Sequence, residues 1–205
     1  MVPVHLSVRA YTGLGRSIDR LAPSIRDSLV PRLKQPSGFL GHFSFASEDG
    51  DLAFVTVCRD SPSGIQADSQ IEEWMLATSS EVAVCKPSIT AGETLLHEIA
   101  SIQRDDDPAM FVIVRFYDDI GPMQEVLPLV REHVFLTITG APGFRGYYAF
   151  LDEQDATRGV AVSLFDERGH AMEANERVVS VMRDRHIAPN PPAIMAGKTV
   201  VVAAA

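Results

Sequence analysis

One phrase is written twice in this 205-residue chain, and its spacing limits the folds that the chain can adopt. The segment PSITAGETLLHE begins at Pro87, and the segment PAIMAGKTVVVA begins at Pro192. Their glycines, Gly92 and Gly197, are 105 residues apart. A period of this size predicts two similar halves, each about as long as a small domain.

Further matches between the halves keep the same order along the chain. Residues Val8–Tyr11 (VRAY) match Val114–Tyr117 (VRFY), and Leu21–Pro23 (LAP) match Val126–Pro128 (VLP). Six such matches in one order, with length changes only in expected loops, indicate a duplication. We therefore predict one repeat at 1–100, a polar linker at 101–108 and a second repeat at 109–205.

Each half has the pattern of a strand, a helix, two strands, a helix and a last strand. The first segment alternates and is rich in β-forming residues, and the next has apolar residues at helical spacing. Pro23 and Pro128, at matching places, predict a kink early in that helix. Asp68 is expected to cap a short helix that turns Ile71 and Trp74 inward.

This order is the ferredoxin-like plan, in which helices cover one face of a sheet. The other face needs a partner layer. We therefore predict an α+β chain of two fused ferredoxin-like βαββαβ repeats, in which the sheet of each half covers the sheet of the other.

Composition excludes several classes of function. The net charge is −9, and no stripe of Lys or Arg is present, so we expect no nucleic-acid partner. No apolar run approaches the ~20 residues of a membrane helix, and the first residues do not resemble a secretory signal. Cys58 and Cys85 lack metal-type spacing, which predicts reduced thiols in a cytoplasmic protein.

With this plan the chain resembles the dimeric α/β-barrel superfamily, near the antibiotic biosynthesis monooxygenase-like proteins. The resemblance rests on the Gly-Phe before each second strand, on EEWM at Glu72–Met75, and on the Pro-x-x-x-Ala-Gly phrase. It covers nearly all of both halves. It implies one dimeric α/β-barrel-type unit within a single chain, present as a monomeric pseudo-dimer or as a homodimer.

The resemblance also implies a range of activities. Members include cofactor-free oxygenases of polyphenols, haem-degrading enzymes, small decarboxylating or isomerising enzymes, and proteins without a known activity. The haem-degrading members use an Asn, a Trp and a His. Trp74 matches, but the first strand has no Asn, and no His follows Trp74 on its helix. We therefore expect no cofactor. If the protein is an enzyme, the resemblance implies a cofactor-independent monooxygenase.

Strand alternation sorts the side chains between two faces. On the first strand we expect Leu6 and Val8 to face the helices, and Ser7 and Arg9 to face the space between the sheets. The expected cavity side chains of both halves are Arg9, Tyr11, His42, Arg115, Tyr117, Arg145 and Tyr147. Arginine binds carboxylate or phenolate oxygens, and tyrosine stacks or hydrogen-bonds, which suits a small anionic or phenolic ligand.

In the enzyme hypothesis the arginines hold the substrate, and His42, Tyr11 or Tyr117 assists proton transfer. The alternative is a non-catalytic protein that binds a ligand or forms an oligomer. In that case Arg9 and Arg115 simply pair with acidic residues such as Asp60 or Asp166.

Two further histidines belong to the predicted site. His5 and His97 lie on the first and fourth strands, which are neighbours in this fold, so either could contact a substrate or act as a base. They could also form a metal pair, but no third ligand is evident, and we predict no metal site. Trp74, spaced with Ile71 and Met75, is interpreted as a core residue.

Overall fold

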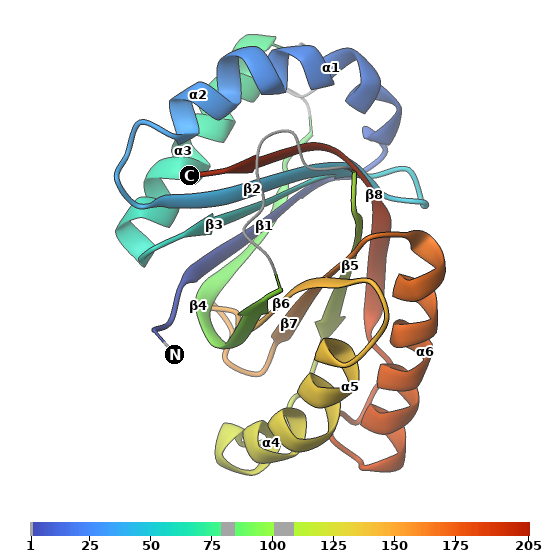
Figure 1. Cartoon of the computed structure of the whole chain (residues 1–205). Helices are drawn as coiled ribbons and strands as arrows, with labels where there is room; N and C mark the ends of the chain where they lie inside the picture. The colour runs from blue at the N-terminus through green and yellow to red at the C-terminus, as the bar shows by residue number, and fades with distance from the viewer. Residues whose placement is uncertain (1, 79–84, 101–108) are drawn as a thin grey trace.

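The residues that the structure describes form a closed antiparallel barrel of eight strands (Figure 1). The computed structural model describes residues 2–78, 85–100 and 109–205. The order around the barrel is β1-β3-β2-β8-β5-β7-β6-β4, and β4 pairs again with β1. The strands are β1 His5–Tyr11, β2 Phe39–Ala46, β3 Leu52–Cys58, β4 Ser88–Ile99, β5 Phe111–Tyr117, β6 Phe144–Leu151, β7 Gly159–Phe165 and β8 Ala193–Ala204.

Two groups of helices pack on the outside of the barrel. Helices α1–α3 lie on one side and α4–α6 on another (Figure 1). The helical segments are η1 Gly15–Ser17, α1 Ile18–Ser24, η2 Ile25–Leu29, α2 Val30–Leu33, α3 Ser61–Thr78, α4 Met123–Leu129, η4 Val130–Phe135, α5 Leu136–Thr139 and α6 Arg168–Asp184. The order strand, helical segment, two strands, helix, strand thus occurs twice. The predicted linker, 101–108, lies outside the described residues.

A proline disturbs the first helical segment of each half at the same point. Pro23 lies inside α1 and Pro128 inside α4. Because proline has no N–H and its ring clashes with the carbonyl of the preceding turn, the regular hydrogen-bond ladder cannot continue there. The chain widens into a π-helix directly afterwards, at η2 and at η4. The predicted irregularity is therefore present in both halves, as a π-helical segment.

The two last strands, β4 and β8, join the halves. The first part of β4 pairs with β1 as far as Glu93, and its second part pairs with β6 from Thr94 onward. Strand β8 likewise pairs with β5 up to Lys198 and with β2 from Thr199. Each long strand therefore passes from the sheet of its own half to the sheet of the other, and this closes the barrel.

The repeated Ala-Gly phrase lies where each long strand makes this passage. A Cβ on Gly92 would lie 2.1 Å from the carbonyl oxygen of Leu151, at the end of β6. A Cβ on Gly197 would lie 2.0 Å from the carbonyl oxygen of Ala46, at the end of β2. Only glycine allows the backbones to approach so closely. The phrase occurs twice because the barrel has two such crossings.

The apolar core has three parts, and their membership corrects the predicted orientation of the strands. The barrel interior is filled by strand side chains that include Leu6, Val8 and Phe43. Tyr11 and Tyr117 instead belong to the two clusters that the helices cover. The expectation that Leu6 and Val8 face the helices was therefore wrong. A shift of one residue exchanges the two faces of a strand, and both faces are buried here.

The second helix of the first half also differs from its prediction. Helix α3 is longer than expected, and Asp68 lies within it and does not cap it. The backbone N–H of Ser63 donates to Oδ1 of Asp60 at 2.9 Å, so Asp60 satisfies a donor at the start of this helix. Asp68 is consequently available to the residues of β1 beneath it.

Candidate functional site

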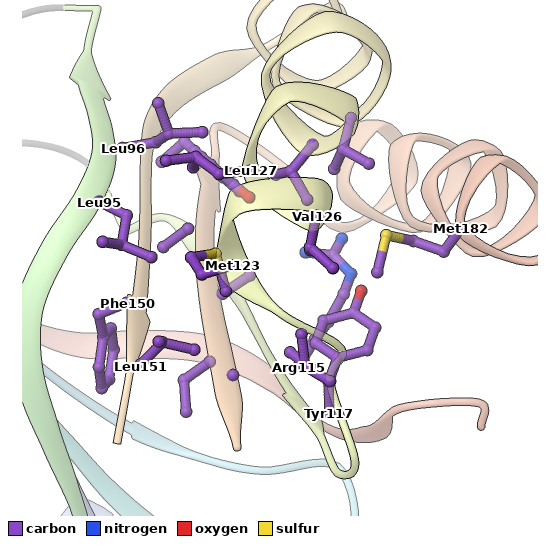
Figure 2. A pocket seen from close by; sticks show the side chains of 18 of the residues that line it. Leu95, Leu96, Arg115, Tyr117, Met123, Val126, Leu127, Phe150, Leu151 and Met182 are labelled. Atoms are coloured by element: carbon purple, nitrogen blue, oxygen red, sulfur yellow. The ribbon is translucent and has the colours of Figure 1, made fainter. Parts of the chain in front are cut away.

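A pocket opens between the sheet and the helices of the second half (Figure 2). Strands β4–β7 form its floor, and α4, η4, α5 and α6 form its walls. Its cavity volume is about 60 Å³, which is small compared with the ~300–1,000 Å³ of typical ligand sites. Its lining is mostly aliphatic, and Arg115, Tyr117 and Tyr147 supply its polar side chains.

The pocket exists because β7 carries small residues where β3 carries large ones. In the first half, Leu52 lies opposite Tyr11 and Phe54 lies opposite Arg9. In the second half these positions are Gly159, opposite Tyr117, and Ala161, opposite Arg115. Leu52 and Phe54 are fully buried and fill the core beneath helices α1–α3. Gly159 and Ala161 line the open space instead.

Arg115 is the charged residue of the pocket, and it is 0% exposed. Its Nε donates to Oδ1 of Asn175 on α6 at 2.8 Å, and its Nη1 donates to Oγ of Ser163 on β7 at 2.8 Å. Its Nη2 is buried and has no hydrogen-bond partner among the residues described here. Burial lowers the pKa of Arg115, and the guanidinium remains a cation at neutral pH.

Two tyrosines stand beside this cation. Burial raises the pKa of Tyr117, and the positive charge of Arg115 offsets part of that rise. Burial also raises the pKa of Tyr147, whose ring packs against Phe135 with 5.7 Å between ring centroids. Both hydroxyl groups therefore stay protonated at neutral pH, so they can donate hydrogen bonds to an oxyanion but are poor bases.

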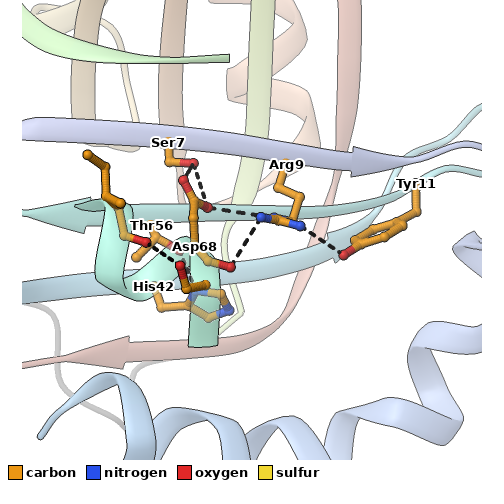
Figure 3. A network of polar contacts seen from close by, with 8 residues as sticks. Ser7, Arg9, Tyr11, His42, Thr56 and Asp68 are labelled. Carbon is orange, nitrogen blue, oxygen red and sulfur yellow. Dashed lines mark hydrogen bonds and ion pairs between the residues drawn. The ribbon is translucent and has the colours of Figure 1, made fainter. Parts of the chain in front are cut away.

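The equivalent place in the first half is a closed polar network (Figure 3). Arg9 is 2% exposed, and its Nε lies 3.6 Å from Oδ1 of Asp68. Its Nη2 donates to the backbone oxygen of Asp68 at 3.1 Å, and its Nη1 donates to the hydroxyl of Tyr11 at 3.3 Å. Ser7 donates to the same carboxylate, with oxygen–oxygen distances of 2.8 and 2.9 Å. Arg9 therefore has a counter-ion within the protein.

His42 is also enclosed in the first half. Its Nδ1 lies 3.0 Å from Oγ1 of Thr56, its Nε2 lies 2.7 Å from Oγ of Ser44, and the ring is 0% exposed. Burial lowers its pKa to about 3, so the ring is neutral at physiological pH. With both nitrogens occupied and no solvent access, His42 is not placed to exchange protons with a substrate in the pocket.

The remaining predicted site residues lie apart from the pocket. His5 faces α3, where a Cβ on Gly64 would lie 2.1 Å from its Nδ1, and its Nε2 contacts Oε1 of Glu153 at 2.7 Å. His97 stacks on Tyr148 with 6.2 Å between ring centroids. It lies in the part of β4 that pairs with β6, so the two histidines are not cross-strand neighbours.

Arg145, on β6, does not line this pocket either. The expected ion pairs of Arg9 and Arg115 with Asp60 or Asp166 are not formed. Arg9 pairs with an acid, but the acid is Asp68 and not Asp60. No ion pair joins Arg115 to Asp166 or to any other acid within the described chain, and Asp166 contacts Nδ1 of His170 at 2.8 Å.

Trp74 is a core residue, as interpreted from its spacing. It is 2% exposed in the cluster beneath α1–α3, and its Nε1 donates to Oγ of Ser28 at 2.7 Å. The sequence also contained an unused signal for the site. When the repeats are aligned, Asp68 stands opposite Asn175, and Phe54 opposite Ala161. These two differences mark the half that is open and carries an uncompensated cation.

Known structures of the same architecture cover nearly the whole chain. A candidate monooxygenase from Fusobacterium nucleatum aligns over 99% of this chain and 95% of its own, with a TM-score of 0.74 and 11% identity. An anthrone oxidase-like protein aligns over 100% and 94%, with a TM-score of 0.61 and 11% identity. A candidate chlorite dismutase aligns over 97% and 95%, with a TM-score of 0.65 and 16% identity.

These likenesses show that the chain has the dimeric α/β-barrel fold. At such identities they show the fold alone. No protein-family model matches the chain, and no curated protein matches it in sequence. None of the helices in the described ranges is long and apolar enough to cross a membrane.

The pocket does not fit a haem group. Of the usual axial ligands of haem iron, His and Cys are missing from the lining, although Tyr and Met side chains are present. The cavity of about 60 Å³ is also far too small for a macrocycle. Within the described ranges, no three His, Cys, Asp or Glu side chains lie close enough together to hold a metal ion.

Proposed function

We propose that this chain is a small-molecule enzyme of the antibiotic biosynthesis monooxygenase-like type, which oxidises an anionic or phenolic metabolite without a cofactor. The observation that carries the proposal is the buried guanidinium of Arg115, which lines an apolar pocket and keeps Nη2 without a partner among the described residues. The names of similar structures, among them an anthrone oxidase-like protein, support the same class of reaction.

In the proposed reaction the substrate supplies the electrons. An activated CH₂ group between aromatic or carbonyl carbons reacts with O₂ to give a C=O group and one molecule of water. The first step is transfer of a proton from the substrate to water at the mouth of the pocket, since no His, Asp or Glu lines it, and this produces an enolate or phenolate. Arg115 stabilises that oxyanion, and Tyr117 and Tyr147 donate hydrogen bonds to it. Of the three residues predicted to assist the reaction, only Tyr117 lines this pocket. His42 and Tyr11 pack in the first half and have no part in the proposed reaction.

The apolar lining has a second function in this scheme. Aliphatic side chains from α4, η4 and α6 exclude water, which strengthens the attraction between the guanidinium and an oxyanion. Because the cavity volume is about 60 Å³, a substrate larger than a few atoms must extend through the mouth or displace the α4–η4 wall.

A second candidate function is a non-catalytic ligand-binding protein. The observation that favours it is that no His, Asp or Glu lines the pocket, so a base for proton removal is absent from its lining. Such a protein would hold the same anionic ligand and release it unchanged.

Oxygen uptake separates the two candidates. The full chain is mixed with a panel of anthrones, which carry the activated CH₂ group, and of naphthols and hydroquinones as phenols that lack it, and oxygen consumption and product mass are measured. The enzyme proposal predicts uptake with at least one compound, loss of uptake in Arg115→Met, and retained uptake in the first-half variant Asp68→Asn. Binding of panel compounds without any oxygen uptake would favour the ligand-binding protein.

We also propose that the halves are two fused ferredoxin-like repeats that arose by duplication. The recurrence of the element order and the reciprocal passages of β4 and β8 support this. One chain then supplies both halves of a barrel, so we propose a cytoplasmic monomer that is a pseudo-dimer. Light scattering after gel filtration tests the oligomeric state, and a mass of two chains would instead indicate the homodimer.

A further inference from the structure

The charge balance around the two equivalent arginines differs, and this difference identifies the ligand more closely. Arg9 and Arg115 occupy paired positions on β1 and β5, each opposite the third strand of its half. The helix above supplies Asp68 to the first arginine and Asn175 to the second. A carboxylate balances a guanidinium, whereas an amide oxygen only accepts its hydrogen bond.

Arg115 is therefore a buried cation without a counter-ion. No carboxylate lies within 4.0 Å of its guanidinium among residues 2–78, 85–100 and 109–205. The groups that influence its ionisation are Tyr117 and Tyr147, and neither is an acid at neutral pH. An isolated charge in an apolar site costs several kcal/mol, so such a charge usually has a partner of opposite sign.

The unpartnered Nη2 indicates where that partner binds. Nε donates to Asn175 and one N–H of Nη1 donates to Ser163, so the second N–H of Nη1 and both N–H groups of Nη2 remain for a group in the pocket. These N–H groups, together with the hydroxyls of Tyr117 and Tyr147 in the lining of the same pocket, suit an oxyanion that carries one negative charge.

We infer that the pocket selects a monoanion over a neutral ligand of similar shape, and that Asn175 is the residue that sets this selectivity. Asn175 orients Arg115 without neutralising it. An acid in its place would pair with the arginine, as Asp68 does in the first half. The inference rests on the proposed function, since it names the substrate class of the same site.

Asn175 is a positioning residue in this scheme, because it acts on the ligand through Arg115. Its side chain is 6% exposed, and it does not line the pocket itself. The exchange Asn175→Asp keeps the shape of the side chain and changes only its charge. The exchange Asp68→Asn makes the reverse change at the equivalent place, where Leu52 and Phe54 leave no room for a ligand.

The test uses two aromatic probes of similar shape, 4-nitrophenol and nitrobenzene, with the full chain. The nitrophenolate anion is yellow and the neutral phenol is not, so absorbance reports the bound ionisation state. Below the pKa of the free phenol, wild-type protein should produce the yellow form. It should bind nitrophenol at least about tenfold more tightly than nitrobenzene, since a hydrogen bond to a charged group is worth at least that factor.

The variants separate a selective site from a structural arginine. Asn175→Asp should lose the yellow form and the tenfold preference while it still binds nitrobenzene, and Asp68→Asn should behave as the wild type. Arg115→Met, which removes the charge, should also lose the preference and serves if Asn175→Asp does not fold. Equal binding of both probes by wild-type protein, binding of neither, or a preference retained in Asn175→Asp would overturn the inference.

This test is independent of turnover. Selective binding of the anion without oxygen uptake from any panel compound would leave the inference in place and remove the enzymatic proposal. Oxygen uptake by a protein that binds both probes equally would overturn the inference and leave the enzymatic proposal in place.

Discussion

The first half of the molecule holds its buried arginine in a closed network, and the second half holds the equivalent arginine at the edge of a hollow. Arg9 has the Asp68 carboxylate 3.6 Å away, and Phe54 fills the space around it. Arg115 has the amide of Asn175 and the small side chain of Ala161. The same strands and helices thus build a solid core in one half and an open pocket in the other.

The comparison separates what the fold needs from what the site needs. A barrel needs both crossings, so the glycines of β4 and β8 are the same in the two halves. It does not need two pockets, because one filled half provides stability through its apolar core. Substitutions at positions where the halves differ should therefore have different effects in the two halves. Substitutions at positions where the halves agree should have equal effects.

The largest predicted effect comes from opening the filled half. Phe54→Ala removes a side chain that is 0% exposed. We expect it to lower the free energy of unfolding by about 4 kcal/mol, because the surrounding core cannot fully close over the lost ring. Urea unfolding measures this. Phe54→Leu, which keeps much of the volume, should cost less than half as much, and equal costs for both variants would contradict the account.

Substitution of the crossing glycines should affect the two halves alike. In Gly92→Ala and in Gly197→Ala the new Cβ meets a backbone carbonyl oxygen at about the same short distance, so strands must separate. We expect each to cost about 3 kcal/mol. Thermal or urea unfolding of both variants checks the match. A large cost at one site and none at the other would show that only one crossing is constrained.

Acid sensitivity should come from the first half. The pKa of His42 is lowered from 6.5 to about 3, so between these pH values the unfolded chain binds a proton that the folded chain does not. Stability is present above pH 6.5 and is lost as the pH falls, at roughly 1.4 kcal/mol per pH unit. The measurement is urea unfolding as a function of pH.

Two matched variants test whether His42 causes this pH dependence of the free energy of unfolding. His42→Gln should flatten it between pH 6 and 4, in the approximate window where the histidine accounts for it. Tyr147→Phe, at the equivalent place in the second half, should leave the slope unchanged because a tyrosine does not titrate there. An unaltered slope in His42→Gln would assign the acid sensitivity to other groups.

The smallest effect is expected from filling the pocket. Ala161→Leu places three more carbons into a cavity of about 60 Å³. At roughly 24 cal/mol per Å³ the gain in stability is at most about 1.4 kcal/mol, and strain reduces it. Thermal unfolding should show an equal or slightly higher midpoint, with loss of nitrobenzene binding. A clear loss of stability would show that the space is already filled.

The sequence predicted the arrangement of elements better than the directions of their side chains. The repeated phrase and the paired prolines gave the two-fold order of strands and helices, since those residues act on the backbone directly. Strand alternation separated Ser7 and Arg9 from Leu6 and Val8 correctly. It could not say which set faces the helices, because both faces of every strand are covered and both contain apolar residues.

The site was predicted in part for the same reason. Arg115, Tyr117 and Tyr147 are brought together, although on the helix side of the sheet. His42 and Arg9 instead interact with partners that lie far away in sequence, Thr56 and Asp68 respectively. Such partners depend on strand register and on helix rotation, and neither is specified by local pattern. Differences between the aligned repeats would have been the better guide.

Paired unfolding of Arg9→Met and Arg115→Met tests the central claim most directly. Arg9→Met leaves the Asp68 carboxylate, which is only 17% exposed, without its cation, so we predict a loss of about 3 kcal/mol in the free energy of unfolding. Arg115→Met removes a buried cation that has no counter-ion, but it also leaves Asn175 and Ser163 without their hydrogen bonds, so we predict a loss of at most about 1 kcal/mol. Comparable losses in both variants would contradict the account, because Arg115 would then have a counter-ion within the protein, as Arg9 has in Asp68.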